Sequence, residues 1–163
     1  MKLMHKQSLI EKIIRHLQTE LENAVQAAEK AHLAATDDQS VAETQYDTLA
    51  IEAAYLAEGQ SRRIVEFQNA LAAYQQLELT PYSEKTGIGL GHLIQLDGDM
   101  DKAHWFFLGP AAAGYRTQIE EQSITVITPH SPMGQALSGK FIDDDICVAL
   151  GKGELNDFIA AVD

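Results

Sequence analysis

Apolar residues in the first half of the chain recur at the spacing of a helix. Within residues 1–79 they alternate steps of four and three, which is the a/d pattern of a coiled-coil seam. The first series contains Ile10, Ile14, Leu17, Leu21, Ala24, Ala28 and Ala31. The second contains Tyr46, Ala50, Ala53, Ala57, Gln60, Ile64, Phe67, Leu71 and Tyr74. Two such helices joined by a short polar segment predict an antiparallel coiled-coil hairpin.

Side-chain size changes along both series. Alanines lie nearest the connecting segment, and Ile, Leu, Phe and Tyr lie at the other end. When the chain folds back, the alanines of the two helices face each other, so the helices can approach closely there. The hairpin is therefore predicted to be a thin rod, with a narrow acidic tip near residues 36–43.

The pattern changes at Thr80-Pro81. Short apolar runs at 91–96, 104–108, 124–128, 146–150 and 157–162 are bounded by Gly, Pro or acidic residues, which is typical of strands. Ser131 through Gly139 predicts one short helix, with Ser131 as N-cap, Pro132 in the first turn and Gly139 as the stop. Residues 80–163 are thus expected to form a small sheet domain, which makes the chain α+β.

Composition narrows the classes of function. The chain has 163 residues and a formal charge of −12, which argues against stable direct binding to DNA or RNA. It has no run of 18 apolar residues and no secretory signal pattern, so we expect a cytoplasmic protein without a membrane span. The single cysteine, Cys147, stands in an apolar run and is expected in the core.

Three patterns resemble known sites but lack essential parts. Gly87-Ile-Gly-Leu-Gly91 has no G-K-[ST] ending and precedes a predicted strand, so a flexible lead into that strand is expected instead of a phosphate loop. The six histidines show no zinc-ligand spacing. Ser131 is better explained as a helix cap than as a nucleophile.

The remaining candidate is the segment 35–47, ATDDQSVAETQYD, which holds four carboxylates and no cation. On a structural interpretation, Ser40 and Glu43 form the capping box of the second helix. On a functional interpretation, the carboxylates supply oxygen ligands to Mg²⁺ held by another molecule, because a lone acidic tip has too few ligands for its own site. The residues alone leave both open.

Two stretches resemble the bacterial Gre transcript-cleavage (elongation) factors, GreA and GreB. Residues 124–140, ITVITPHSPMGQALSGK, followed by Asp143-Asp-Asp-Ile146, are similar to the family's strand, S-P-x-G-x-A-L-x-G-K and strand segment. Glu58-Gly59, followed by Arg63-Ile64, resembles the family's E-G-R-I segment. The resemblance implies a coiled-coil hairpin at 1–79, followed by an FKBP-like antiparallel sheet domain at 80–163.

The resemblance also implies a partner and a mechanism. Gre factors dock on RNA polymerase and insert the hairpin into its secondary channel, where tip carboxylates help to hold Mg²⁺ so that backtracked RNA is cleaved. This chain would then be a regulator acting through the polymerase catalytic site rather than an enzyme, with no cofactor of its own and only indirect contact with the nascent RNA 3′ end.

At the tip the family pattern is D-x-x-E-N. Counting back from Glu58-Gly59 places Glu43 on its Glu, Ser40 on its Asp and Thr44 on its Asn. Asp38, with Asp37 beside it, is the carboxylate that would replace the missing Asp. Glu43, Asp38 and Asp37 are therefore the predicted site residues, with Glu43 and Asp38 as ligands of an Mg²⁺ shared with polymerase.

Three functions follow from these observations. The first is a Gre-type factor that stimulates cleavage of backtracked RNA. The second is a Gre-like modulator of polymerase that does not cleave. The third, from another class, is an FKBP-type prolyl isomerase or chaperone, which needs a deep pocket lined by several aromatic residues. The aromatic residues of the second half lie mostly in predicted strands, where core packing is expected.

Overall fold

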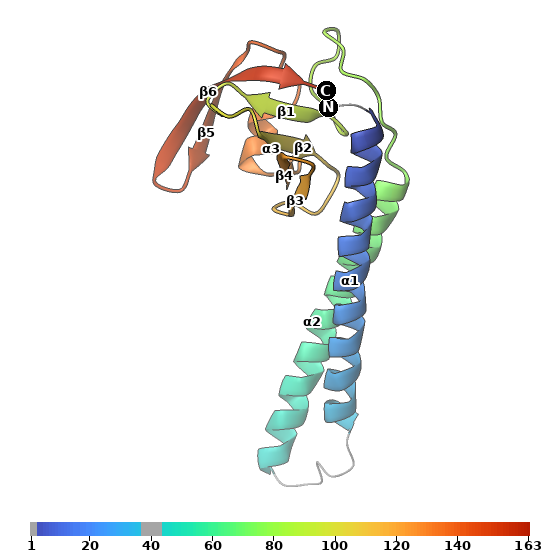
Figure 1. Ribbon diagram of the computed structural model, residues 1–163. Coiled ribbons are helices and arrows are strands. Elements are labelled where there is room, and N and C mark those ends of the chain that lie inside the picture. Colours follow the sequence, from blue (N-terminus) through green and yellow to red (C-terminus); the bar gives the residue numbers. More distant parts are fainter. Residues whose placement is uncertain (1–2, 37–43) are drawn as a thin grey trace. The chain divides into compact units, whose positions relative to one another are not determined.

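The computed structural model describes residues 3–36 and 44–163 (Figure 1). Two long helices come first, α1 (Leu3–Thr36) and α2 (Thr44–Gln75). The remaining elements are β1 (Leu93–Leu96), β2 (His104–Leu108), β3 (Arg116–Ile119), β4 (Gln122–Ile127), α3 (Pro132–Leu137), β5 (Asp145–Leu150) and β6 (Gly153–Val162). No helix in the described ranges is both long and apolar enough to span a membrane.

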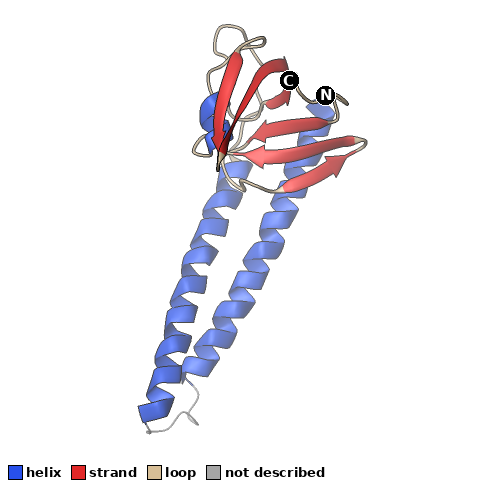
Figure 2. Cartoon of the chain, turned by 90° about the vertical axis from the view of Figure 1, so that its left-hand side faces the viewer, coloured by secondary structure: helices blue, strands red, loops and turns tan. Residues whose placement is uncertain are grey.

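Residues 15–72 form one compact unit, the two-helix part of the hairpin. Its helices run side by side in opposite directions (Figure 2), and Arg63 on α2 lies 3.9 Å from the carboxylate of Glu20 on α1. Leu17 and Ala24 are buried between them. The other predicted seam positions whose side chains are described here are partly buried: Leu21, Ala28, Ala31, Ala53, Ala57, Gln60, Ile64, Phe67 and Leu71. The predicted seam is confirmed in this unit.

Residues 1–14 and 73–163 form the second compact unit. Here the predicted seam shifts by one residue, because Leu9 and Ile13 are fully buried while Ile10 and Ile14 are only partly buried. At this end α1 packs within the same unit as residues 73–163, so a wider face is covered than a two-helix seam would cover. The division between residues 79 and 80 stays a prediction.

The strands form a sheet in the order β3-β4-β2-β1-β6-β5. All neighbouring strands are antiparallel except β2 and β4, which are parallel and pair Trp105 with Ile124 and Phe107 with Val126. The predicted fold class is confirmed: a helical hairpin is followed by a small, mostly antiparallel sheet with one short helix. The parallel pair and β3 were not predicted.

The core of this unit lies around the sheet and α3. It contains the buried side chains Ile88, Ile94, Leu96, Leu108, Ile127, Leu137, Ile146, Val148 and Ile159. The Tyr74 hydroxyl, at the end of α2, donates a 2.7 Å hydrogen bond to the Ala111 carbonyl. Burial raises the pKa of Tyr74 above its usual value, so the phenol keeps the proton that this bond requires.

Candidate functional site

The predicted tip residues Asp37, Asp38 and Glu43 lie outside the described residues, as does Ser40. Their assignment as Mg²⁺ ligands stays a prediction. In the part of the chain that the structure describes, no group of three or more His, Cys, Asp or Glu side chains could hold a metal ion. The candidate surfaces that can be described are therefore the groove beside α3 and the outer face of α2.

The segment Ser131–Lys140 forms α3 and the turn that follows it. The Ser131 hydroxyl oxygen accepts a 3.1 Å hydrogen bond from the Gly134 N–H and donates one of 2.7 Å to the Thr128 carbonyl. Pro132 is the first helical residue, as predicted. A Cβ at Gly134 would overlap the Thr128 carbonyl oxygen, so only glycine lets α3 approach this turn so closely.

The end of α3 is joined to the segment that leads into β1. The Ile88 N–H donates to the Lys140 carbonyl at 2.9 Å, and the Gly139 N–H donates to the Ile88 carbonyl at 2.8 Å. Gly87 and Gly139 both have positive φ, at 73° and 75°. The predicted flexible lead into the first strand is therefore hydrogen-bonded on both sides of Ile88, which is buried.

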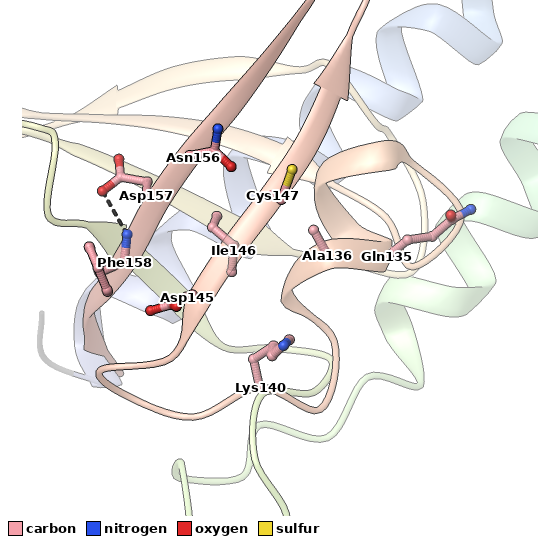
Figure 3. Close-up of a pocket in the computed structure, with 9 residues that line it drawn as sticks. All are labelled: Gln135, Ala136, Lys140, Asp145, Ile146, Cys147, Asn156, Asp157 and Phe158. Carbon is pink, nitrogen blue, oxygen red and sulfur yellow. Dashed lines mark hydrogen bonds between the residues drawn. The ribbon is translucent and has the colours of Figure 1, made fainter.

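A groove of about 610 Å³ lies between α3 and the neighbouring strands β5 and β6 (Figure 3). Gln135 and Ala136 line it from α3, and Lys140 lies at the turn after that helix. The strands contribute Asp145, Ile146, Cys147, Asn156, Asp157 and Phe158. The lining thus includes charged residues of both signs and Phe158, whose side chain is exposed.

Cys147 corrects one expectation from the sequence. It is exposed and lines the groove, whereas its neighbours Ile146 and Val148 on β5 are buried. Side chains alternate between the faces of a strand, so an apolar run on a strand with one covered face puts every second residue outside. The same alternation on β6 buries Ile159 and leaves Phe158 53% exposed.

The groove does not resemble the deep aromatic pocket that a prolyl isomerase needs. Phe158 is the single aromatic residue among its lining residues. Phe107 is fully buried, and Tyr82 and Phe106 pack against the core. In the described chain, the aromatic residues thus serve the core more than a pocket, which leaves the isomerase function without a specific observation in its favour.

Both ring nitrogens of His92 form hydrogen bonds with backbone groups. Its Nδ1 accepts a 2.9 Å hydrogen bond from the Gly89 N–H, and its Nε2 lies 3.1 Å from the Thr80 carbonyl, to which it donates in this tautomer. Burial lowers the pKa of His92, although the bond to Thr80 opposes the shift and the nearby Lys6 charge adds to it. Burial also lowers the pKa of Lys6 on α1 and that of His104 on β2.

We expect the unit that contains His92 to lose stability in acid. The pKa of His92 in the folded chain lies below the usual value of about 6.5. Between these two pH values, His92 therefore binds a proton in the unfolded chain but not in the folded chain. Stability is therefore full above about pH 6.5. As the pH falls towards the folded pKa, stability decreases by up to about 1.4 kcal/mol per pH unit.

Urea unfolding between about pH 7.5 and 5 measures this loss. His92→Asn should flatten the pH dependence. His104 accounts for part of the slope that remains. Equal slopes in the wild type and His92→Asn would show that His92 does not set this pH dependence.

The outer face of α2 carries large apolar side chains. Tyr55 is 70% exposed and Leu56 63% exposed, and Ile51 is exposed in the preceding turn. The arginines near them both have partners: Arg62 Nη2 lies 3.2 Å from Glu58, and the Arg63 guanidinium lies 5.7 Å from the Phe67 ring centre as well as near Glu20. This face was not predicted, because the seam pattern identifies only the opposite side of the helix, which packs against α1.

No protein-family model matches this chain, and no curated protein does. Three solved structures are similar over most of their length. One is the transcription factor Gfh1, with 19% identity over 91% of this chain and 92% of that chain, at a TM-score of 0.38. The GreA factor homolog 1 of Thermus thermophilus has 19% identity over 96% and 93%, at 0.35. Gfh1 of Thermus aquaticus has 21% identity over 91% and 92%, at 0.33. At these TM-scores the likeness carries no further conclusion.

Proposed function

We propose that this chain is a Gre-type transcription factor that binds RNA polymerase through its groove and inserts its hairpin into the secondary channel. One observation carries the proposal. The segment SPMGQALSGK, on which the resemblance to Gre factors depends, forms α3 with its cap and following turn and lines an open groove. The same chain carries a helical hairpin, so both parts that such a factor needs are present.

The dimensions of the hairpin support insertion into a channel. The 34 residues of α1 span about 50 Å at 1.5 Å per residue. Two packed helices are about 20 Å across, since one helix with its side chains is about 10 Å wide. A rod of this size can reach deep into a channel of a large complex.

The charges support a protein partner. The formal charge is −12, and the two arginines on the exposed face of α2 are engaged by Glu58 and Glu20. Phosphates are bound through clusters of unneutralised Lys and Arg, and this part of α2 has none. Nascent RNA would therefore meet this factor only indirectly, near the polymerase active site.

Within this function we favour modulation of polymerase without efficient cleavage. Glu43 occupies the position of the family's Glu, but Ser40 occupies that of its Asp. A neutral hydroxyl is a weaker ligand for Mg²⁺ than a carboxylate. Asp38 and Asp37, two and three residues before Ser40, are the carboxylates that could replace the missing one. Any Mg²⁺ would be held jointly with polymerase.

Binding to immobilised RNA polymerase core enzyme tests the proposal. We expect the wild-type chain to bind and Lys140→Glu to bind roughly tenfold more weakly, because it reverses a charge on the groove. Lys152→Glu is the matched control, since this exposed lysine lies in the β5–β6 turn and does not line the groove. Absence of wild-type binding, together with turnover of a proline-containing peptide, would instead assign the isomerase function.

A further inference from the structure

Gly59 stands in the interior of α2, where glycine is the least favourable residue after proline. The backbone does not require it, because its φ is not among the positive values in this chain. Packing does not require it either. A Cβ there would meet no described atom within 4 Å, apart from the nearby backbone of the helix itself. The described structure thus contains no reason for a glycine here.

The neighbours of Gly59 on the helix surface suggest a reason outside the chain. Residues three and four positions away lie beside it, and they are Tyr55, Leu56, Arg62 and Arg63. Tyr55 and Leu56 are two of the most exposed large apolar side chains of the described protein. They lie around a position without a side chain, where the α2 backbone is partly accessible.

The two arginines beside Gly59 both have acidic partners. Arg62 and Glu58 form a pair on α2, and Arg63 lies over the Phe67 ring and near Glu20. Paired arginines offer little to a phosphate chain, whereas exposed apolar side chains with a polar rim suit a polypeptide segment. Arg62 is 72% exposed, and its guanidinium has five N–H donors, so it can bind a further carboxylate beside Glu58.

A second copy of the chain fits this surface less well than a different polypeptide does. An antiparallel crossing of two α2 helices centred on Gly59 places Glu52 of one copy opposite Glu66 of the other. Both residues are exposed and of like charge, and the whole chain already carries −12. Like charges placed opposite each other disfavour such a contact.

We propose that the face formed by Tyr55, Leu56, Gly59 and Arg62 is a docking surface for a polypeptide segment of RNA polymerase. An apolar side chain of that segment packs onto the α2 backbone at Gly59, between Tyr55 and Leu56, and an acidic side chain beside it binds Arg62. This inference rests on the proposed function, which supplies the partner. It adds the place on α2 and the chemistry of the segment that meets it.

Substitution of Gly59 separates an effect on stability from an effect on binding, because the thermal stability should rise while the affinity for polymerase should fall. Gly59→Ala fills open space in a helix, so it should raise Tm by roughly 2–4 °C. The same change should weaken binding to RNA polymerase core enzyme roughly threefold, and Gly59→Leu roughly tenfold or more. Thermal unfolding and titration of the full-length chain against core enzyme measure both.

Ala54→Leu is the matched control for added bulk. Ala54 is exposed on α2 and lies about 140° around the helix from Gly59, at about 100° per residue. The Ala54→Leu chain should bind core enzyme as tightly as the wild type does. A lower Tm for Gly59→Ala would show that the position is not open and would overturn the inference.

The other outcomes also decide the question. Wild-type affinity in Gly59→Leu overturns the inference and leaves the proposed function intact, whereas absence of wild-type binding to core enzyme overturns the proposed function itself. Loss of affinity only in complexes that contain nascent RNA would assign this face to RNA. A wild-type dimer that Gly59→Leu converts to a monomer in sedimentation would assign it to a second copy.

Discussion

Gly134→Ala is expected to destabilise the unit that contains the sheet by about 3 kcal/mol. The added Cβ would overlap the Thr128 carbonyl oxygen and would lie 3.0 Å from the Ser131 hydroxyl oxygen. Relief requires α3 to move away from the turn at 128–131, which breaks the bond from the Gly134 N–H to the Ser131 cap. Urea unfolding of the purified chain measures the change, and Tm should fall by roughly 10 °C.

Gly153→Ala makes the same chemical change where no described atom lies within 4 Å of the new Cβ, so it should leave stability nearly unchanged. Equal stability of Gly134→Ala and Gly153→Ala would show that the approach of α3 to Thr128 is not tight. Because α3 lines the groove, Gly134→Ala should also weaken polymerase binding. The segment that resembles the Gre family therefore has a structural requirement as well as a proposed role in docking.

Ser40→Asp is expected to increase release of 3′-terminal RNA from a stalled, backtracked polymerase complex by roughly ten- to a hundredfold. The change places a carboxylate where the D-x-x-E-N pattern has one, and altering groups that support a bound metal commonly changes activity by about this factor. Glu43→Ala, introduced into the Ser40→Asp chain, should remove the gain, since both carboxylates are needed. Gel analysis of labelled RNA measures the release.

Ser61→Asp is the matched control for Ser40→Asp. It makes the same substitution at an exposed position on α2, far from position 40 in sequence, and should produce no cleavage. Efficient release by the wild-type chain that Glu43→Ala abolishes would contradict the non-cleaving function and would support Asp38 as the second carboxylate. Neither result depends on the contact that we propose at Gly59.

The hairpin was predictable from the sequence because its seam is repetitive. Steps of four and three residues identify the buried side of each helix without knowledge of any partner. The prediction failed at Ile10 and Ile14, which are less buried than Leu9 and Ile13. A seam pattern describes two helices alone, whereas residues 1–14 also belong to the unit with residues 73–163.

The sheet was predicted less completely, for reasons that depend on particular strands. β3 reads Arg-Thr-Gln-Ile, and only Ile119 is buried, so no apolar run marked it. The parallel pairing of β2 with β4 depends on where the connection through β3 places the chain, which local spacing does not encode. Cys147 was misplaced because its apolar neighbours concealed the alternation of β5.

The candidate site, too, was only partly predictable from the sequence. The segment Ser131–Lys140 was found because its cap, proline and glycines are local signals, and the structure shows what each of them does. The groove required tertiary contacts among α3, β5 and β6 that no single segment of the sequence reveals. The exposed face of α2 could have been found from Ile51, Tyr55 and Leu56, which lie off the seam and are apolar.

The sheet order also limits the order in which the protein can assemble during synthesis. β6 is the last strand in the sequence, yet it lies between β1 and β5. β5 therefore cannot join the sheet until β6 has been made. Burial of residues near the start of the chain is also delayed, because Leu9 and Ile13 belong to the compact unit that contains β6. Burial of the base of α1 is thus completed only when the ribosome has made the whole sheet.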